Sequence, residues 1–168
     1  MTSSRKILYI AFLLLACLSC QSRKEPIAQL QDQLTDDSIA LKKLQDNYQE
    51  RLWADFRWCD SMLQYIPKEQ VDEYFKSLNL AQAYLSQFDE MLPVMQQTIS
   101  YTRQQLKSLK NDIDTHYLKD SIAAAYLDDE AAVVDTLHYR VLYFQERLAQ
   151  QDKALNSTKK SIRKAAKP

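Results

Sequence analysis

Glycine is absent from all 168 residues, and this absence excludes several kinds of fold and site. Glycine supplies the positive φ angles of tight hairpin turns and lets a backbone approach a phosphate closely. A phosphate-binding loop, a dinucleotide-binding loop and a fold of many β-hairpins are therefore not expected. Leu, Gln, Lys, Asp and Ala are abundant instead, so the chain is predicted to be all-α.

Histidine is also scarce, since the chain has only His116 and His138. Neither lies in an H-E-x-x-H pattern, and no serine stands in a nucleophile-elbow pattern. The seven acids between Asp112 and Asp135 lack the spacing of a calcium loop, and a solvated loop explains them better. We expect no enzymatic activity, no metal site and no cofactor.

An excess of positive charge is missing as well, because the chain has 22 basic and 22 acidic residues. Removal of an N-terminal segment that contains Arg5 and Lys6 would leave 20 basic residues and a net charge near −2. Nucleic acids select proteins with a basic surface or stripe. We therefore expect no nucleic-acid partner.

The first twenty residues have the three-part layout of a secretory signal. Arg5 and Lys6 precede an apolar stretch that begins at Ile7 and is about a dozen residues long, and a small residue, Ala16 or Ser19, stands before the cysteine that follows it. A membrane-spanning helix needs roughly 20 apolar residues, so a transmembrane anchor is not expected.

The tetrad Leu14-Leu15-Ala16-Cys17 resembles the cleavage motif of bacterial lipoproteins. The resemblance implies cleavage before Cys17, a diacylglycerol on its thiol and acylation of its new amine, and several acyl chains hold a protein firmly to a membrane. Cys20 is the alternative, although Cys17 then takes the place of the usual Leu. Neither cysteine is followed by Asp, which implies the outer membrane rather than the inner one. The resemblance covers residues 1–20, and the rest of the chain resembles no family.

These boundaries divide the chain into four segments. We expect a signal peptide at 1–16, or 1–19 if Cys20 is lipidated. A lipidated N-terminus and linker would follow at 17–26, a helical coiled-coil domain at 27–164, and the end of a basic tail at 165–168.

A heptad repeat carries the prediction of a helical bundle. Steps of three and four residues from Val71 to His116 select an apolar residue at twelve of fourteen positions, where a 46% apolar chain gives about six by chance. A second repeat runs from Leu127 to Ile162, with three polar interruptions. A less regular one runs from Leu30 to Ile66 and contains a stutter between Leu44 and Phe56. Such repeats predict helices packed in a left-handed coiled coil.

Breaks in the pattern set the expected helices near 27–65, 68–114 and 120–164. Pro67 is followed by Lys-Glu-Gln, which is typical of a helix start. Short connections imply an antiparallel three-helix bundle. Pro93 falls inside the second helix, where we expect a kink because the heptad keeps its phase; a turn that makes four helices is the alternative.

Two surfaces are candidate interaction sites. The second helix has extra apolar residues beside its heptad and no Lys or Arg between Ser77 and Thr102, which suits either a broad buried face or a partner surface; these residues are Leu80, Tyr84, Met91, Val94 and Tyr101. The C-terminal tail has five cations and no acid, which suits a helix C-terminus or an anionic surface; they are Lys159, Lys160, Arg163, Lys164 and Lys167.

Aromatic residues crowd the end of the first helix. Trp53, Phe56 and Trp58 lie within six residues. Packing in the core or a groove is favoured, and a partly exposed tryptophan at an interface or a lipid headgroup region is the alternative.

Three functions remain open from the sequence. The leading hypothesis is a non-enzymatic envelope lipoprotein that acts as a spacer or protein-interaction module, such as an accessory subunit of an outer-membrane assembly, with a protein partner or self-association. The second is a lipid- or ligand-binding bundle with a cavity lined by Phe88, Met91, Met95 and Phe144. The third is a tether to peptidoglycan through the basic tail.

Overall fold

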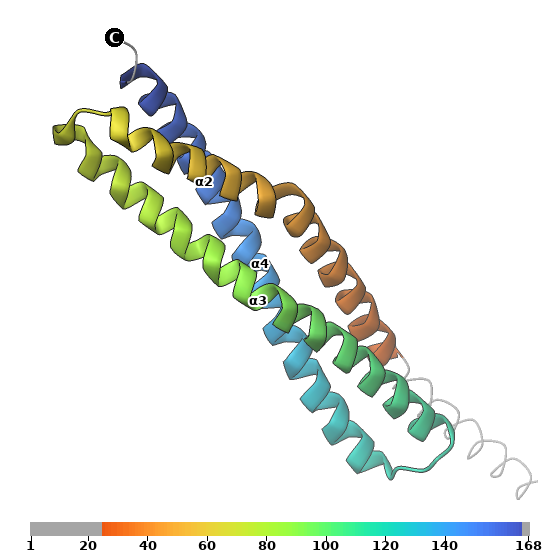
Figure 1. Cartoon of the computed structure of the whole chain (residues 1–168). Helices are drawn as coiled ribbons and strands as arrows, with labels where there is room; N and C mark the ends of the chain where they lie inside the picture. Colours follow the sequence, from red (N-terminus) through yellow and green to blue (C-terminus); the bar gives the residue numbers. More distant parts are fainter. Residues whose placement is uncertain (1–24, 166–168) are drawn as a thin grey trace, which may run out of the picture. The chain divides into compact units, whose positions relative to one another are not determined.

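The computed structural model describes residues 25–165, and these residues form an all-α antiparallel three-helix bundle without a strand. Residues 25–44 are α-helical and continue directly into the π-helix η1 (Gln45–Gln49), α2 (Glu50–Met62) and the 3-10 helix η2 (Leu63–Tyr65). Two long helices follow, α3 (Lys68–Asp114) and α4 (Asp120–Ala165) (Figure 1). The predicted fold class and the predicted helix ranges are confirmed.

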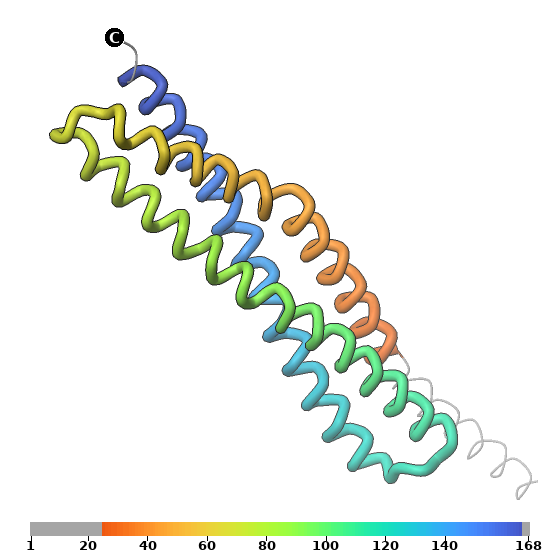
Figure 2. Tube along the Cα trace, viewed as in Figure 1, coloured from red at the N-terminus to blue at the C-terminus, as the bar shows by residue number. Residues whose placement is uncertain are grey.

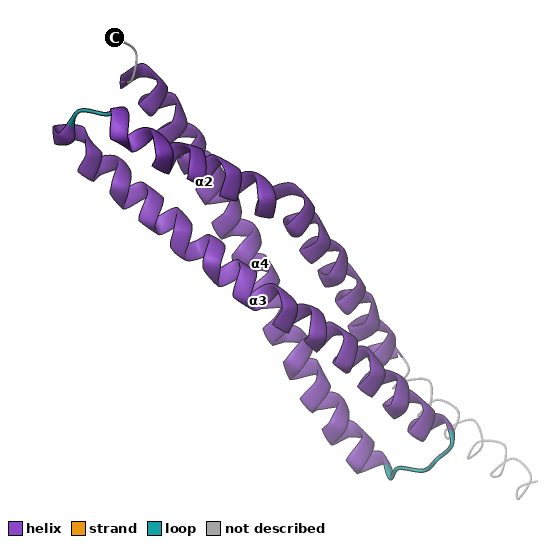
Figure 3. Ribbon diagram, viewed as in Figure 1, coloured by secondary structure: helices purple, strands orange, loops and turns teal. Residues whose placement is uncertain are grey.

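The chain divides into two compact units. Unit 1 contains the described residues up to Thr35 together with Tyr101–Asp135, and unit 2 contains Asp36–Ser100 with Thr136 and the residues after it. Each unit packs three helical segments, because α3 and α4 contribute to both (Figure 2). Two short connections join the helices, one before Lys68 and one after Asp114 (Figure 3).

Heptad positions form the core, as the sequence pattern predicts. On α3 every heptad position from Leu78 to Ile113 is buried. On α4 the polar interruptions Gln151 and Thr158 are buried with their apolar neighbours. In unit 2 the rings of Phe88 and Phe144 pack edge to face, with centroids 5.3 Å apart. Burial of apolar side chains at this spacing supplies most of the stability of such helices.

The first helical run comprises residues 25–65. The π-helix η1 lies within it, at the predicted stutter between Leu44 and Phe56. The buried positions Leu41 and Leu44 precede it, and the next fully buried residue is Leu52. A π-helical turn contains more residues than an α-helical turn, so it absorbs steps of four and returns the later apolar residues to the core. The irregular sequence therefore produces a local change of helix type.

Pro93 lies within α3, and α3 is continuous through it. The alternative of a turn and four helices is therefore wrong. Pro93 has no N–H for the carbonyl of Asp89, four residues earlier. The carboxylate of Asp89 instead fixes this turn to the preceding helices: Oδ1 accepts a hydrogen bond from Nε2 of Gln49 at 2.8 Å, and Oδ2 accepts one from Nε1 of Trp53 at 2.8 Å.

The end of α3 in unit 1 is a Schellman motif closed by a histidine. The N–H of Tyr117 donates to the carbonyl of Asp112 at 2.9 Å, and the N–H of His116 donates to the carbonyl of Ile113 at 3.2 Å. His116 has a φ of 55°, in the left-handed region that glycine usually occupies in this motif. Because the chain has no glycine, a residue with a Cβ carries this strain.

Candidate functional site

The residues of the predicted apolar surface differ in exposure. Leu80 and Val94 are 53% and 46% exposed, whereas Tyr84 and Met91 are half-buried. Their spacing of four, seven and three residues places these four on one face of α3 in unit 2. Tyr101 is exposed and belongs to unit 1. Apolar side chains thus remain in solvent on a helix whose core face is already filled.

Arg147 of α4 completes this surface. Its guanidinium carbon lies 5.7 Å from the ring centroid of Tyr84 and 5.4 Å from that of Tyr143. Its Nη1 donates to Oε1 of Gln150 at 3.0 Å, and Nε2 of Gln150 donates to Oε1 of Glu146 at 2.8 Å. Two rings and one amide thereby hold the cation in place.

We define the α3–α4 surface as Leu80, Tyr84, Met91, Val94, Tyr143 and Arg147, all in unit 2. Tyr, Met and Arg are enriched in protein interfaces, and a side chain held in place loses little entropy on binding. The sequence pattern found the α3 residues. It missed Tyr143 and Arg147: their spacing of four places them together on α4, but their position beside Tyr84 depends on how the helices pack.

The tryptophans occupy different sides of α2. The Trp53 ring meets that of Phe56 edge to face at 5.5 Å and donates to Asp89. Trp58 is half-buried and lies against α4, with Nζ of Lys159 at 5.5 Å and the guanidinium carbon of Arg163 at 5.1 Å from its ring centroid. Both rings therefore serve contacts between helices, as the packing hypothesis expects.

The predicted basic tail is part structural and part exposed. Lys159 forms an ion pair with Asp55 of α2, and Arg163 lies over Trp58. Lys160 and Lys164 are exposed, and neither has a hydrogen-bond or ion-pair partner among residues 25–165. Lys167 and the predicted lipidation sites Cys17 and Cys20 lie outside the described residues.

Part of the acidic segment between Asp112 and Asp135 lines a small groove in unit 1. It has a volume of about 240 Å³ and is lined by residues of α3, α4 and their connection, among them Asp112, Tyr126 and Glu130. Burial, and secondarily the charge of Asp129, raises the pKa of Glu130. Within the described part of the chain, no group of three or more His, Cys, Asp or Glu is placed to hold a metal ion.

The residues proposed to line a ligand cavity lie mostly in the core. Phe88, Met95 and Phe144 are buried, and Met91 is half-buried. Phe88 and Phe144 are in mutual ring contact. Ligand binding at this place stays a prediction without a supporting contact.

The buried Cys59 has the environment of a structural cysteine. It lies on α2 in unit 2, and its thiol is free. Burial raises its pKa to about 11, although the nearby Lys159 acts in the opposite direction. A thiol with this pKa is protonated at neutral pH and is a poor nucleophile.

The chain matches no protein-family model, no curated protein and no solved structure. Among the described residues, no helix is sufficiently long and apolar to cross a membrane.

Proposed function

We propose that the chain is a non-enzymatic lipoprotein of the bacterial envelope whose helical bundle binds a protein partner through the α3–α4 surface. It would act as a spacer or as an accessory subunit of an outer-membrane assembly. Acyl chains at Cys17, with Cys20 as the alternative, would hold the N-terminus at the membrane.

One observation carries the choice of surface: large apolar side chains are exposed on the face of α3 that carries Tyr84, and Tyr84 and Tyr143 hold Arg147 in place. Burial of Leu80 and Val94 by a partner would gain roughly 0.7–1.5 kcal/mol for each residue, because each side chain is already about half buried. Arg147 would give the same interface a hydrogen-bonding anchor, since its guanidinium has several N–H donors and Gln150 accepts only from Nη1.

A crosslinking experiment in intact cells tests the surface. A photoreactive amino acid at Val94 should give one dominant protein adduct, and the adduct should disappear when Leu80→Glu is added. Leu142→Glu is the matched control, because Leu142 is 48% exposed but lies elsewhere on α4, about 140° around the helix from Arg147. Equal adduct yields from the two folded Glu variants would reject the α3–α4 surface.

The envelope anchor has a separate test. Labelled palmitate should be incorporated into the wild-type chain and into Cys20→Ser, but not into Cys17→Ser. Incorporation that is lost only in Cys20→Ser would move the anchor to Cys20, and no incorporation in any form would reject lipidation. Fractionation should place the labelled chain in the outer membrane.

A further inference from the structure

A second surface of unit 2 combines cations with a tryptophan. We define the basic–tryptophan surface as Trp58 of α2 with Lys160, Arg163 and Lys164 of α4. Arg163 is held over the Trp58 ring at 5.1 Å, and Lys160 and Lys164 are exposed and one helical turn apart. This surface shares no residue with the α3–α4 surface.

The charge of this surface is not neutralised within unit 2. The carboxylates Asp55 and Asp152, which form ion pairs between α2 and α4, are already paired with Lys159 and Arg51. The hydrogen bond from Arg51 to Asp152 raises the pKa of Arg51, so the Arg51 guanidinium stays charged. Asp60 lies about 200° around α2 from Trp58, on another side of the helix. Three cations therefore face solvent without a carboxylate partner among the described residues.

A helix C-terminus favours cations, but the helix dipole does not require them to lie beside a tryptophan. Stacking on Trp58 fixes the guanidinium of Arg163 and leaves its N–H groups free, and a guanidinium fork matches the geometry of a phosphate. An indole with one polar edge and one apolar face suits the boundary between headgroups and acyl chains.

We propose that the basic–tryptophan surface binds the phosphate headgroups of an anionic phospholipid membrane. Lys160 and Lys164 would supply attraction at long range, Arg163 would contact a phosphate, and Trp58 would lie at the level of the headgroups. Each cation near an anionic bilayer contributes to affinity, and the contribution falls as salt screens the charges.

The test uses the full chain in phosphatidylcholine vesicles, with Trp53→Phe so that Trp58 is the single fluorophore. In one arm, phosphatidylglycerol is included in the vesicles that carry the protein. In the other arm, it is included in separate vesicles that are added afterwards. In each arm, the vesicles that contain phosphatidylglycerol also carry a nitroxide on the lipid headgroup. In at least one arm, the nitroxide should quench the fluorescence of Trp58 only when phosphatidylglycerol is present. This quenching should decline with added salt. Quenching that is equal with and without phosphatidylglycerol in both arms would overturn the proposal.

Charge variants identify the residues. Lys160→Gln with Lys164→Gln should lower the apparent affinity for phosphatidylglycerol roughly 30-fold, the loss expected for two surface cations. Lys107→Gln with Lys110→Gln is the matched control, since it removes two exposed lysines of α3 in unit 1 and should leave the quenching unchanged. Circular dichroism checks that each variant is folded.

An equal loss of affinity in the two double variants would show that binding depends only on the net charge of the chain. That result would reject a defined binding surface. If the chain binds polyglutamate but does not bind phosphatidylglycerol, the partner of this surface is an acidic protein and the lipid proposal is rejected. Neither result bears on the α3–α4 surface, so the two proposals fail separately.

Discussion

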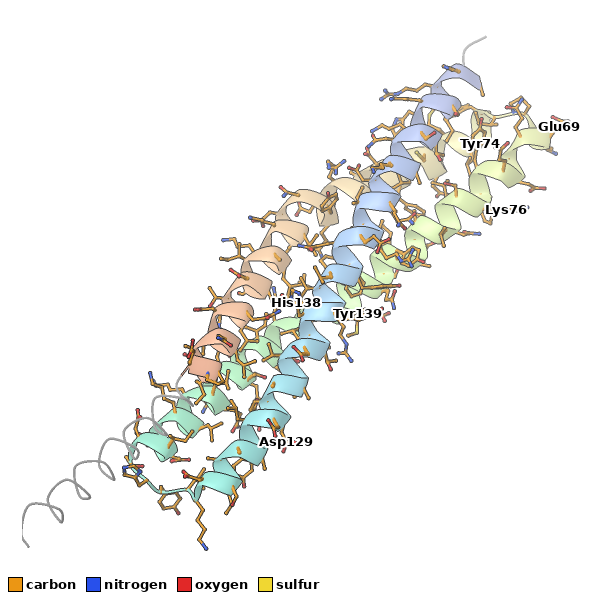
Figure 4. All side chains as sticks on the ribbon, turned by 180° about the vertical axis from the view of Figure 1, so that it is seen from behind. Glu69, Tyr74, Lys76, Asp129, His138 and Tyr139 are labelled. Carbon is orange, nitrogen blue, oxygen red and sulfur yellow. The ribbon has the colours of Figure 1, made fainter. Side chains whose placement is uncertain are left out.

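Nδ1 of His138 lies 2.8 Å from Oδ1 of Asp37, and this pair joins α4 to the first helical run within unit 2. The Asp37 side chain is 3% exposed and the His138 side chain 41%, and Figure 4 labels His138 on α4 next to Tyr139. Oδ2 of Asp37 is buried and has no hydrogen-bond partner among the described residues. His138 therefore provides the only hydrogen bond that this carboxylate has in the described structure.

Replacement of His138 should destabilise the folded chain, because the buried carboxylate of Asp37 then has no hydrogen-bond partner among the described residues. We expect His138→Leu to lower the free energy of unfolding by about 1–3 kcal/mol, because Asp37 is left buried without a partner. Asp37→Leu with His138→Leu should recover most of the loss, since an apolar pair needs no hydrogen bond. Urea unfolding of His138→Leu, Asp37→Leu and the double variant measures the coupling, and a double variant whose loss equals the sum of the two single losses would contradict it.

Glycine at position 116 should stabilise the chain. His116 adopts a left-handed conformation that costs about 1 kcal/mol for a residue with a Cβ. His116→Gly should therefore raise the free energy of unfolding by up to about 1 kcal/mol, reduced by the greater flexibility of glycine in the unfolded chain. His116→Val should lower it, because a branched Cβ fits this conformation least well. Thermal unfolding of both variants checks the sign, and a more stable Val than Gly variant would refute this account.

Replacement of Pro93 should also stabilise α3. Pro93→Ala restores a donor for the carbonyl of Asp89 and removes the clash with the proline ring, so we expect a gain of about 1–3 kcal/mol. The measurement is the midpoint of urea unfolding. Gln96→Ala, at an exposed position on the same helix, is the control and should change the midpoint little. A Pro93→Ala variant less stable than wild type would show that the proline is required for packing.

Glu130 should make unit 1 less stable as the pH rises through the acidic range. Burial and Asp129 raise its pKa above the ordinary 4.5, so the folded state binds the proton more tightly than the unfolded state. The free energy of unfolding therefore falls as the pH rises from below 4.5 through the raised value, and the loss is complete above it.

Glu130→Gln removes this titration. The variant should melt at a higher temperature than wild type at neutral pH, and the two should melt alike well below pH 4.5. Asp128→Asn removes an exposed neighbouring charge and should give no such pH-dependent difference. A constant difference between Glu130→Gln and wild type at all pH values would exclude titration of Glu130 as its cause.

The fold class and the three helices could be predicted from the pattern of apolar residues and prolines. Heptad spacing on α3 and α4 requires burial of one face, and this follows from the 3.6-residue turn without knowledge of the neighbours. The stutter near Leu44 likewise predicted a local irregularity, which the structure realises as η1. Pro67 marked the start of α3, because proline is favoured at the N-terminal end of a helix, where its missing N–H leaves no intrahelical hydrogen bond unmade.

The contacts between side chains of different helices could not be predicted in this way. Heptad spacing between Leu34 and Leu41 places Asp37 on the core face, but it cannot identify the hydrogen-bond partner His138, 101 residues away. The contacts of Arg147 with Tyr84 and of Arg163 with Trp58 likewise join different helices. The period of a helix fixes the face on which a residue lies. The partner of that residue depends on the rotation and axial position of the helix against its neighbours. The packing of all the core side chains together sets this rotation and this position.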